Sequence, residues 1–496
     1  MKREYLPIET LSAWTRLNGI SVDGVTFRKL RTEDGIDKGC AIVATGEKSN
    51  ESSETGEVDA EALLRVPSDL ILSLRLVETH AKSDRYLREV LDAIGDFGRT
   101  ARGAILIFLI LQITYSSPDF ADEHHRIGVS NPWTEYIQYL PSSITLPTFY
   151  TVEERELLRG TSLKLAVDAK IASLENEFEL LRQSTENISW CRKHWWDEDT
   201  GRFTLDDWKY VDAMYRSRMV DLPSSGHAMV PCIDMANHAS EDIVKALYEE
   251  DTEGNAVLQL RSGRKLHSDE EVTISYGDDK PASEMIFSYG FLENEREGAK
   301  QIFLNLDIPE DDPLIMAKKR VCKAPPGLRL FDAPTVERGS TDWDSPFVWW
   351  LCVNQEDGLE FEVLQTNDGG RELKVSWKGE EIKDPNDIKS LLAKDPLWDI
   401  FQLRAVVTVL DRLESHFLIL RETQIMVEEI NHNEDMLALF RPEVYNTINS
   451  LRELEGKLLE QGVEDLVQQR QDLMASEAVA AYLTQQQADD VEEDFS

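Results

Sequence analysis

Hydrophobic residues follow two spacings along the chain, and the changes between them predict the order of its elements. After Pro7, apolar residues three and four apart run from Ile8 to Leu17 and stop at Gly19, which predicts a short helix. Short β-branched runs with turn-rich borders follow, and they predict strands at 25–30, 40–45, 63–66 and 70–72. Residues 46–61 contain almost no apolar side chain, so we expect an exposed loop there.

Helical spacing dominates from about residue 73 to about residue 215. Residues 102–115 predict a buried helix, and residues 152–181 have the apolar spacing of helical structure. Thr204, with Asp207 three residues later, predicts a capped helix start that continues through Tyr215. The longest apolar run, 104–111, is shorter than the roughly 20 residues that cross a bilayer. We therefore expect it in a protein core.

Strand character returns at 257–260 and 272–275, and residues 284–289 predict a helical turn. Beyond about residue 300, strand-like segments at 361–364 and 373–377 flank Asn367-Asp368-Gly369-Gly370, which predicts a hairpin. Residues 399–422 and 441–461 predict long helices. The acidic tail, 489–496, is expected to fray.

The charge of the chain limits its partners. Its 496 residues carry 53 Lys and Arg against 93 Asp and Glu, a formal net charge of −40. An acidic surface repels nucleic acid and anionic membranes, so neither is expected as the main partner. A basic protein would be attracted, although the charge also serves solubility without any partner. The sequence leaves the oligomeric state undetermined.

Five cysteines are scattered at positions 40, 191, 232, 322 and 352, without a CxxC or similar zinc spacing. This pattern excludes a zinc-cluster module and a disulfide framework, so no metal is expected and a reducing compartment is favoured. The N-terminal MKREYLPIET has no apolar signal core, which makes the cytoplasm or nucleus the expected location. The chain also lacks the phosphate-loop, dinucleotide-binding, H-E-x-x-H and G-x-S-x-G motifs.

The stretch 216–293 concentrates the polar residues of interest. Asp234, Asn237 and His238 close an apolar segment, where buried polar groups must find partners. Tyr276 and Tyr289 each precede a glycine. Taken singly, these features indicate a capped turn and core tyrosines with anchored hydroxyl groups.

The order of the motifs changes this interpretation. Residues 230–240 resemble the D-x-x-N-H segment of SET-domain protein methyltransferases, and 271–277 and 281–291 resemble the Tyr-Gly strand and helix that follow it there. Residues 63–73, 104–112, 131–141 and 154–161 are similar, in order, to further motifs of the Rubisco large-subunit methyltransferase-like branch. The resemblance covers about residues 5–300.

The resemblance implies an α+β fold, in which a knotted, β-rich SET domain with a helical insert precedes a mainly α-helical C-terminal domain. The implied boundaries are 1–90 for the N-terminal SET part, 91–212 for the insert, 213–300 for the C-terminal SET part and 301–496 for a substrate-binding-like domain. It also implies S-adenosylmethionine as cofactor. The cofactor-binding positions would be Lys38, Gly39, Cys40, Ser217, Arg218, Asp234, Asn237, His238 and Tyr276.

By the same resemblance, Tyr276 is the catalytic side chain, and Tyr289, Phe291 and Tyr248 line the pocket for the target lysine. The sequence departs from the family at Ala41, where a second glycine is usual. A positive φ there would make Ala weaken cofactor binding, whereas a negative φ would make it harmless.

The implied activity is S-adenosylmethionine-dependent N-methylation of a lysine in a protein. The scattered cysteines favour a non-histone substrate, because histone-directed relatives often carry zinc-binding cysteine clusters. A basic protein with an exposed lysine is the expected partner, and ribosomal or translation proteins recur as targets within the branch. The alternatives are a protein-histidine methyltransferase and a SET-scaffold binding protein without catalysis.

Overall fold

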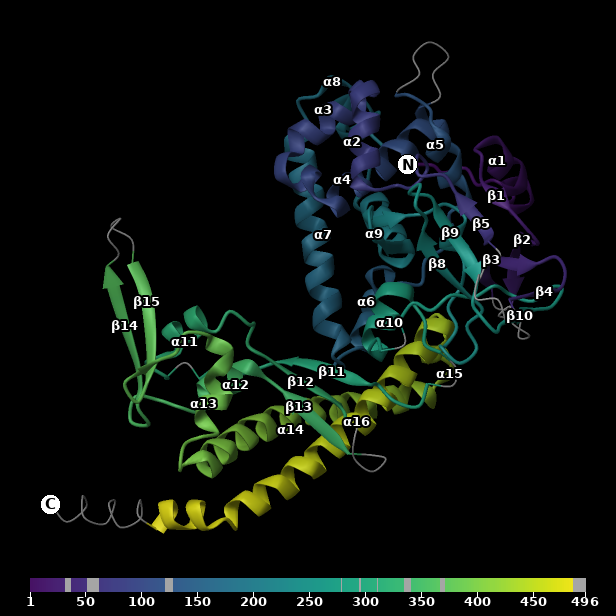
Figure 1. The fold of residues 1–496 in the computed structure, drawn as a ribbon. Helices are drawn as coiled ribbons and strands as arrows, with labels where there is room; N and C mark the ends of the chain where they lie inside the picture. The colour runs from purple at the N-terminus through teal and green to yellow at the C-terminus, as the bar shows by residue number, and fades with distance from the viewer. Residues whose placement is uncertain are drawn as a thin grey trace. The chain divides into compact units, whose positions relative to one another are not determined.

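The computed structural model describes residues 1–31, 37–50, 62–120, 128–277, 279–293, 296–309, 311–333, 340–365 and 371–484 (Figure 1). The chain forms two compact units, each assembled from segments that are distant in sequence. The first comprises Met1–Phe149, Val167–Asp279 and Ser288–Gly290, and the second comprises Tyr150–Ala166, Lys280–Phe287 and Phe291–Ser496.

The first unit contains an antiparallel sheet with strand order β1-β5-β9-β8 and the strand pairs β2–β3, β4–β10 and β6–β7. β5 pairs with β9, and β4 pairs with β10, so early and late parts of the sequence are joined across the helices between them. The strands are β1 (Ser21–Val22), β2 (Val25–Arg31), β3 (Asp37–Ala44), β4 (Lys48–Ser49), β5 (Ala62–Val66), β6 (Met219–Leu222), β7 (Gly226–Met229), β8 (Ala246–Glu250), β9 (Ala256–Leu260) and β10 (Lys265–Leu266).

Helix α4 (Ala101–Ser116) is central to the first unit. Every residue from Gly103 to Thr114 is buried, and α2, α3, α5 and α9 pack against it, as the apolar run predicted. Among the described residues, no helix has both the length and the apolarity that a membrane span needs. The other helices of this unit are α1 (Leu11–Leu17), α2 (Leu74–Ser83), α3 (Arg85–Ile94), α5 (Pro132–Tyr136), most of α7 (Leu163–Thr185), α8 (Ser189–Cys191) and α9 (Leu205–Arg218).

The predicted capping box at the start of α9 is confirmed. The Thr204 hydroxyl accepts the Asp207 N–H, and the Asp207 carboxylate accepts the Thr204 N–H at 3.0 Å. The helical spacing over 152–181 does not correspond to one continuous helix. The chain forms α6 (Val152–Glu156), breaks, and restarts as α7. Gly160 has φ +84°, a left-handed conformation that ends a helix.

Two predicted strands are also corrected. Residues 70–72 form a turn whose Leu72 makes one isolated bridge to Met229. Residues 272–275 lie outside the named strands, although Ile274 bridges His238 in parallel. Both segments are buried and β-branched or apolar, and that composition alone does not distinguish a strand from an extended segment with single bridges. The strands predicted at 25–30, 40–45, 63–66 and 257–260 are confirmed as β2, β3, β5 and β9.

The second unit is built on two long helices, α14 (Trp398–Asn431) and α16 (Pro442–Met474), which pack against each other. Both extend beyond the lengths predicted for them. The hairpin of β14 (Leu359–Gln365) and β15 (Arg371–Trp377) is confirmed, while its turn, like residues 51–61 and the acidic tail, lies outside the described residues. The remaining elements are α10 (Ala282–Tyr289, shared with the first unit), α11 (Ile315–Val321), α12 (Pro346–Leu351), α13 (Ile388–Leu392), α15 (Glu434–Leu437), β11 (Gln301–Asn305), β12 (Gly327–Asp332), β13 (Thr341–Asp344) and β16 (Glu380–Glu381).

The break after α6 is held against α14 and α16 by buried charged side chains. Arg452 donates to the carbonyls of Leu157, Arg159 and Leu420, at 3.1, 2.8 and 2.7 Å. Glu455 accepts the Ser162 N–H at 2.8 Å and its hydroxyl at 2.5 Å. The bonds to the Leu157 and Arg159 carbonyls and to the Ser162 N–H satisfy backbone groups at the break, while the bond to Leu420 reaches α14.

Glu455 makes the stability of this region depend on pH. Burial raises the pKa of its carboxyl to about 7, partly offset by the Ser162 hydrogen bonds and by Arg452. The pKa of this carboxyl is higher in the folded than in the unfolded state. Its contribution to the stability of the fold is therefore fully present below about pH 4.5 and is lost as pH rises through 7. We expect the free energy of unfolding of Glu455→Gln, measured relative to wild type, to increase by on the order of 3 kcal/mol from pH 5 to pH 8. Urea unfolding of both full chains, followed by hydrogen exchange in α16, measures this difference, and a pH-independent difference would contradict it.

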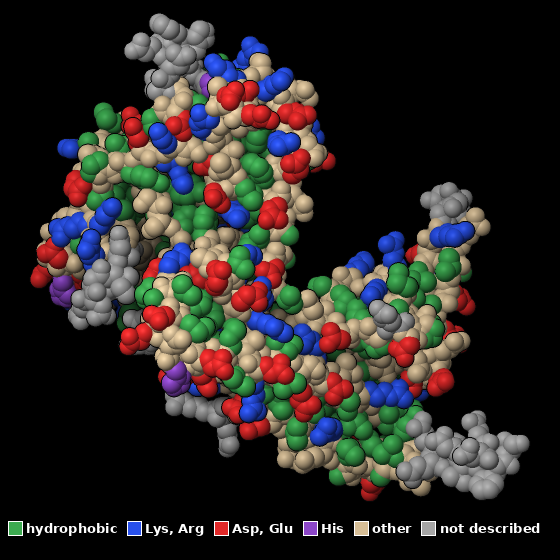
Figure 2. Space-filling view, turned by 180° about the vertical axis from the view of Figure 1, so that it is seen from behind, with side chains coloured by type: hydrophobic (Ala, Val, Ile, Leu, Met, Phe, Trp, Pro, Cys, Tyr) green, Lys and Arg blue, Asp and Glu red, His purple; other side chains and the backbone are tan. Residues whose placement is uncertain are grey.

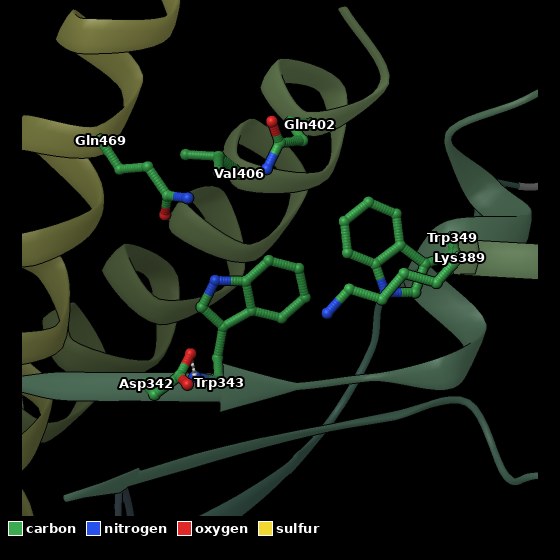
Figure 3. Close-up of a pocket in the computed structure, with 7 residues that line it drawn as sticks. All are labelled: Asp342, Trp343, Trp349, Lys389, Gln402, Val406 and Gln469. Atoms are coloured by element: carbon green, nitrogen blue, oxygen red, sulfur yellow. Dashed lines mark hydrogen bonds between the residues drawn. The ribbon is translucent and has the colours of Figure 1, made fainter. Parts of the chain in front are cut away.

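A pocket of about 100 Å³ lies in the second unit (Figure 3). The rings of Trp343 and Trp349 stack at 5.7 Å and 20°, and the Lys389 ammonium lies 5.1 Å from the centre of the Trp349 ring. Its full lining is Asp342, Trp343, Trp349, Lys389, Gln402, Val406 and Gln469. This lining includes none of the residues that the sequence assigned to cofactor or lysine.

Acidic and basic side chains are interspersed on the face shown in Figure 2. Many of the ion pairs join exposed groups, for example Arg85 with Glu89 and Lys457 with Glu453. Such pairs contribute little to stability. On this face the acidic side chains therefore lie among basic ones rather than in one acidic patch.

Candidate active site

Tyr276 lies at the centre of a small aromatic group in the first unit. Its hydroxyl donates to the Ala236 carbonyl at 2.8 Å, and its backbone N–H donates to Nδ1 of His238 at 3.0 Å. The rings of Tyr276 and Tyr289 are 4.4 Å apart at 30°, and the ring of His238 stacks on Tyr276 at 5.2 Å. The structure therefore brings together three residues that the sequence placed 38 and 13 positions apart.

The protonation states of this group follow from its contacts. Because Nδ1 of His238 accepts a backbone N–H, the neutral ring carries its proton on Nε2. Burial raises the pKa of Tyr276, and Arg218 offsets this effect only in part, so the hydroxyl stays protonated near neutral pH. That hydroxyl donates to Ala236, which leaves its oxygen lone pairs available as acceptors.

Both tyrosines precede a glycine for a conformational reason. Gly277 has φ +114° and Gly290 has φ +84°, values that other residues rarely adopt. A Cβ on Gly290 would also lie 2.8 Å from Oγ1 of Thr145. The two Tyr-Gly pairs thus mark sharp turns that fix where each tyrosine leaves the backbone.

Arg218, the last residue of α9, pairs with Asp234. Its Nη1 donates to the Asp234 carbonyl at 2.7 Å and contacts Oδ2 at 3.3 Å. The Asp234 side chain is fully buried. Burial would lower the pKa of Arg218, but Asp234 more than compensates and the pKa is raised. Burial raises the pKa of Asp234, which Arg218 and the Tyr136 hydroxyl offset in part.

The other edge of the Arg218 guanidinium is unused. Nε is buried without a hydrogen-bond partner among the described residues, while the side chain as a whole keeps 16% exposure. All the hydrogen bonds that Arg218 makes to those residues run from Nη1. The edge formed by Nε and Nη2 is the one that binds a carboxylate in two-point fashion. An anionic group fits here.

Asn237 and His238 are held in an extended segment. The Asn237 amide donates to Glu271 at 2.6 Å. Its carbonyl accepts the Ile274 N–H at 2.9 Å, and Ala239 N–H donates back to Ile274 at 3.0 Å. These bonds fix the backbone of the Asn-His pair beside Tyr276.

Gly39 and Cys40 lie in β3, which packs against the 3-10 helix η7 (Ile233–Met235) that carries Asp234. Gly39 has φ +81°, and the space that a Cβ would take there is open. Ala41 lies inside β3 opposite Arg28 and is not among the residues with positive φ. The departure at Ala41 is therefore harmless to the backbone. Lys38 belongs to β3, and its side chain lies outside the described residues.

The remaining three predicted positions are Ser217, Tyr248 and Phe291. The Ser217 hydroxyl donates to the Ala213 carbonyl at 2.8 Å within α9. Tyr248 lies on β8 opposite Leu258 and packs against the same core as Tyr276. Phe291 belongs to the second unit.

The sequence did not single out Tyr136 or the backbone of Cys232. The Tyr136 hydroxyl donates to Oδ1 of Asp234 at 2.5 Å and accepts the Cys232 N–H at 2.8 Å. Cys232 has φ +71°, unusual for a residue other than glycine. Tyr136 does lie in the 131–141 motif, which was its only signal in the sequence.

Known proteins provide a comparison for this arrangement. No protein-family model matches the chain. It is 32% identical over 278 residues to "SET domain-containing protein 8" of Schizosaccharomyces pombe, which is 55% of this chain and 60% of that protein. It is 28% identical to the chloroplastic "[Fructose-bisphosphate aldolase]-lysine N-methyltransferase" of Arabidopsis thaliana, over 50% of this chain and 52% of that protein. The match to the "Actin-histidine N-methyltransferase" of Xenopus tropicalis is 22% identical and covers 82% of this chain and 62% of that protein. The chain thus spans less than two thirds of each of these relatives.

A solved structure resembles nearly the whole chain. The crystal structure of the SET domain of LSMT bound to lysine and AdoHcy superposes with a TM-score of 0.62 at 18% identity, covering 94% of this chain and 92% of that one. The predicted fold class, an α+β SET fold followed by a helical C-terminal region, is confirmed. The chain therefore shares the SET fold of Rubisco LSMT and is similar in sequence to SET-domain methyltransferases, as the ordered motifs predicted.

Proposed function

We propose that this protein is an S-adenosylmethionine-dependent protein-lysine N-methyltransferase that acts on a non-histone protein. The observation that carries the proposal is the unused Nε–Nη2 edge of Arg218, together with the adjacent rings of Tyr276 and Tyr289, whose centres are 4.4 Å apart. A cationic edge suits the carboxylate of an amino-acid moiety, and two tyrosine faces suit an alkylammonium chain.

The residues of the site fit S-adenosylmethionine. Arg218 would hold its carboxylate, and the open space at Gly39 admits a ligand close to the β3 backbone. The fixed backbone of Asn237 and His238 would pair with the adenine. When bound, S-adenosylmethionine supplies an electrophilic methyl group. Ser217, Lys38 and Cys40 complete the proposed cofactor set.

Tyr276 and Tyr289 would position the lysine amine. A free lysine has a pKa of about 10.4 and must lose its proton before it attacks. Removal of the amine from water beside these rings favours its neutral form. The acceptor lone pairs of the Tyr276 oxygen suit an amine N–H or a weak C–H···O contact. Transfer of the methyl group to the neutral amine would leave the demethylated thioether, and one amine proton would pass to water. Alignment and exclusion of water supply most of the acceleration.

The domain boundaries and the partner form part of the same proposal. Residues 1–90 and 213–300 would build the SET domain around an insert at 91–212, with 301–496 holding the substrate. A basic segment around the lysine would be drawn to the acidic chain, with an on-rate that falls as salt increases. The cytoplasm or nucleus stays the expected compartment.

A protein-histidine methyltransferase is the second candidate. The actin-histidine relative aligns with 82% of this chain. The Schizosaccharomyces pombe and Arabidopsis thaliana relatives align with 55% and 50% of it. A histidine ring could pack against the same aromatic surface beside the two tyrosines. A methyl group adds the same mass to lysine as to histidine, so the mass of the peptide does not distinguish the two candidates. Locating the modified residue within the peptide does.

Titration calorimetry with S-adenosylmethionine and with its demethylated product tests the proposal first. We expect binding in the micromolar range, about −8 kcal/mol. Basic proteins incubated with the enzyme and cofactor are then mapped by tandem mass spectrometry. Methyl groups on lysine Nε support the proposal, and methyl groups on histidine rings select the second candidate. No binding of either compound at millimolar concentration would reject both.

A further inference from the structure

Tyr136 occupies a fully buried position at the end of α5. Its ring lies 4.9 Å from Trp14 and 5.2 Å from Trp133. A phenylalanine would fill the same space, so packing does not explain the hydroxyl group. A buried hydroxyl is retained at a cost unless it forms hydrogen bonds.

The hydroxyl of Tyr136 makes two hydrogen bonds to one short turn. It accepts the N–H of Cys232 and donates to Oδ1 of Asp234. Cys232 has φ +71°, a left-handed conformation that costs about 1–3 kcal/mol for such a residue. The bond to its N–H therefore stabilises a turn that the sequence alone does not favour.

Asp234 transmits this contact to Arg218. Oδ1 is used by Tyr136, whereas Oδ2 and the Asp234 carbonyl are used by Nη1 of Arg218. Those bonds fix the guanidinium plane, and so they fix the direction of its unused Nε–Nη2 edge. Tyr136 is 98 residues from Asp234 in sequence and makes no described hydrogen bond to Arg218 itself.

Loss of the hydroxyl would loosen this arrangement. Asp234 would keep a buried oxygen without its donor, which favours the protonated carboxyl. Burial already raises the pKa of Asp234, and the Tyr136 bond is one of the contacts that oppose the rise. A protonated Asp234 would no longer hold Arg218 as an ion pair.

We propose that Tyr136 is a positioning residue for the cofactor carboxylate, acting through Asp234 to orient the Nε–Nη2 edge of Arg218. This inference rests on the proposed function, because it presumes that Arg218 binds S-adenosylmethionine. It assigns no contact between Tyr136 and the cofactor.

The test compares Tyr136→Phe with Tyr139→Phe in the full chain. Tyr139 belongs to the same aromatic cluster, and its hydroxyl shares a 2.8 Å hydrogen bond with Thr10 instead of reaching Asp234. We expect Tyr136→Phe to raise the Kd of S-adenosylmethionine by about tenfold, with the larger loss at low pH, where Asp234 takes up a proton. Tyr139→Phe should lower the melting temperature by about as much as Tyr136→Phe does, and it should leave the Kd unchanged.

An unchanged Kd in a folded Tyr136→Phe protein would overturn the inference, and so would equal losses of affinity in both variants. Wild-type protein that does not bind the cofactor would instead reject the proposed function. Where Tyr136→Phe does not fold, Asp234→Asn keeps the side-chain shape and removes the charge that Arg218 faces. It should weaken binding by a comparable factor, and full affinity in that variant would equally overturn the inference.

Discussion

Replacing Tyr276 by phenylalanine should reduce methyl transfer by about 10²-fold, with a much smaller effect on the affinity for S-adenosylmethionine. The hydroxyl is fixed by its 2.8 Å bond to Ala236, and the ring is held between His238 and Tyr289. Phenylalanine keeps both ring contacts and removes only the oxygen that would orient the amine. Single-turnover rates at saturating cofactor, together with calorimetric affinities, separate these two effects.

Tyr115→Phe is the matched control. The Tyr115 hydroxyl donates to Asp84 at 2.9 Å, in the helical part of the first unit. Its removal deletes one tyrosine hydrogen bond, as at Tyr276, without touching the candidate site. We expect a small loss of stability and an unchanged transfer rate. Full activity of Tyr276→Phe with retained cofactor binding would remove Tyr276 from the chemistry.

Replacing Arg218 by methionine should have the largest combined effect on stability and binding. Asp234 would keep a fully buried carboxylate without its cation, and breaking a buried pair in this way typically costs about 3–5 kcal/mol. Affinity for S-adenosylmethionine should fall by about 10²-fold, because the charged hydrogen bonds to its carboxylate are lost. Denaturant unfolding and calorimetry measure the two losses.

The loss of stability in Arg218→Met should depend on pH, because the variant leaves the Asp234 carboxyl without its cation. Without Arg218, the pKa of Asp234 rises further above its unfolded value, since burial is then opposed by fewer contacts. Stability contributed by a carboxyl with a raised pKa is present at low pH and lost as pH rises. We therefore expect Arg218→Met to be more destabilised at pH 8 than at pH 5.

Two further variants separate the structural role of Arg218 from its binding role. Adding Asp234→Asn to Arg218→Met removes the uncompensated charge, so it should recover part of the stability but none of the affinity. Arg216→Met removes a neighbouring arginine on the same helix, whose partner Asp212 keeps Arg102 and Lys170. Cofactor affinity that survives in Arg218→Met but falls in Arg216→Met would contradict the assignment of the carboxylate to Arg218.

The sequence alone determined the elements whose signals are local. The capped start of α9 follows from Thr204 and Asp207, three residues apart, and the buried helix α4 follows from an apolar run that any fold must cover. The ordered motifs also predicted Tyr276, His238 and Arg218 as site residues, because their spacing in the chain is itself the signal. Tyr276 and His238 contact each other directly, and Arg218 lies in the same unit.

Tertiary structure decided the features that depend on distant partners. The helix over 152–181 breaks because Arg452 and Glu455, some 300 residues later, satisfy the backbone groups that the break exposes. Leu72 and Ile274 form single bridges instead of strands, because each pairs with its distant partner, Met229 or His238, at one position only. Local patterns determine which backbone conformations cost little free energy. The hydrogen bond from Tyr136 to Asp234 joins residues 98 positions apart, so it exists only once the chain between them has folded.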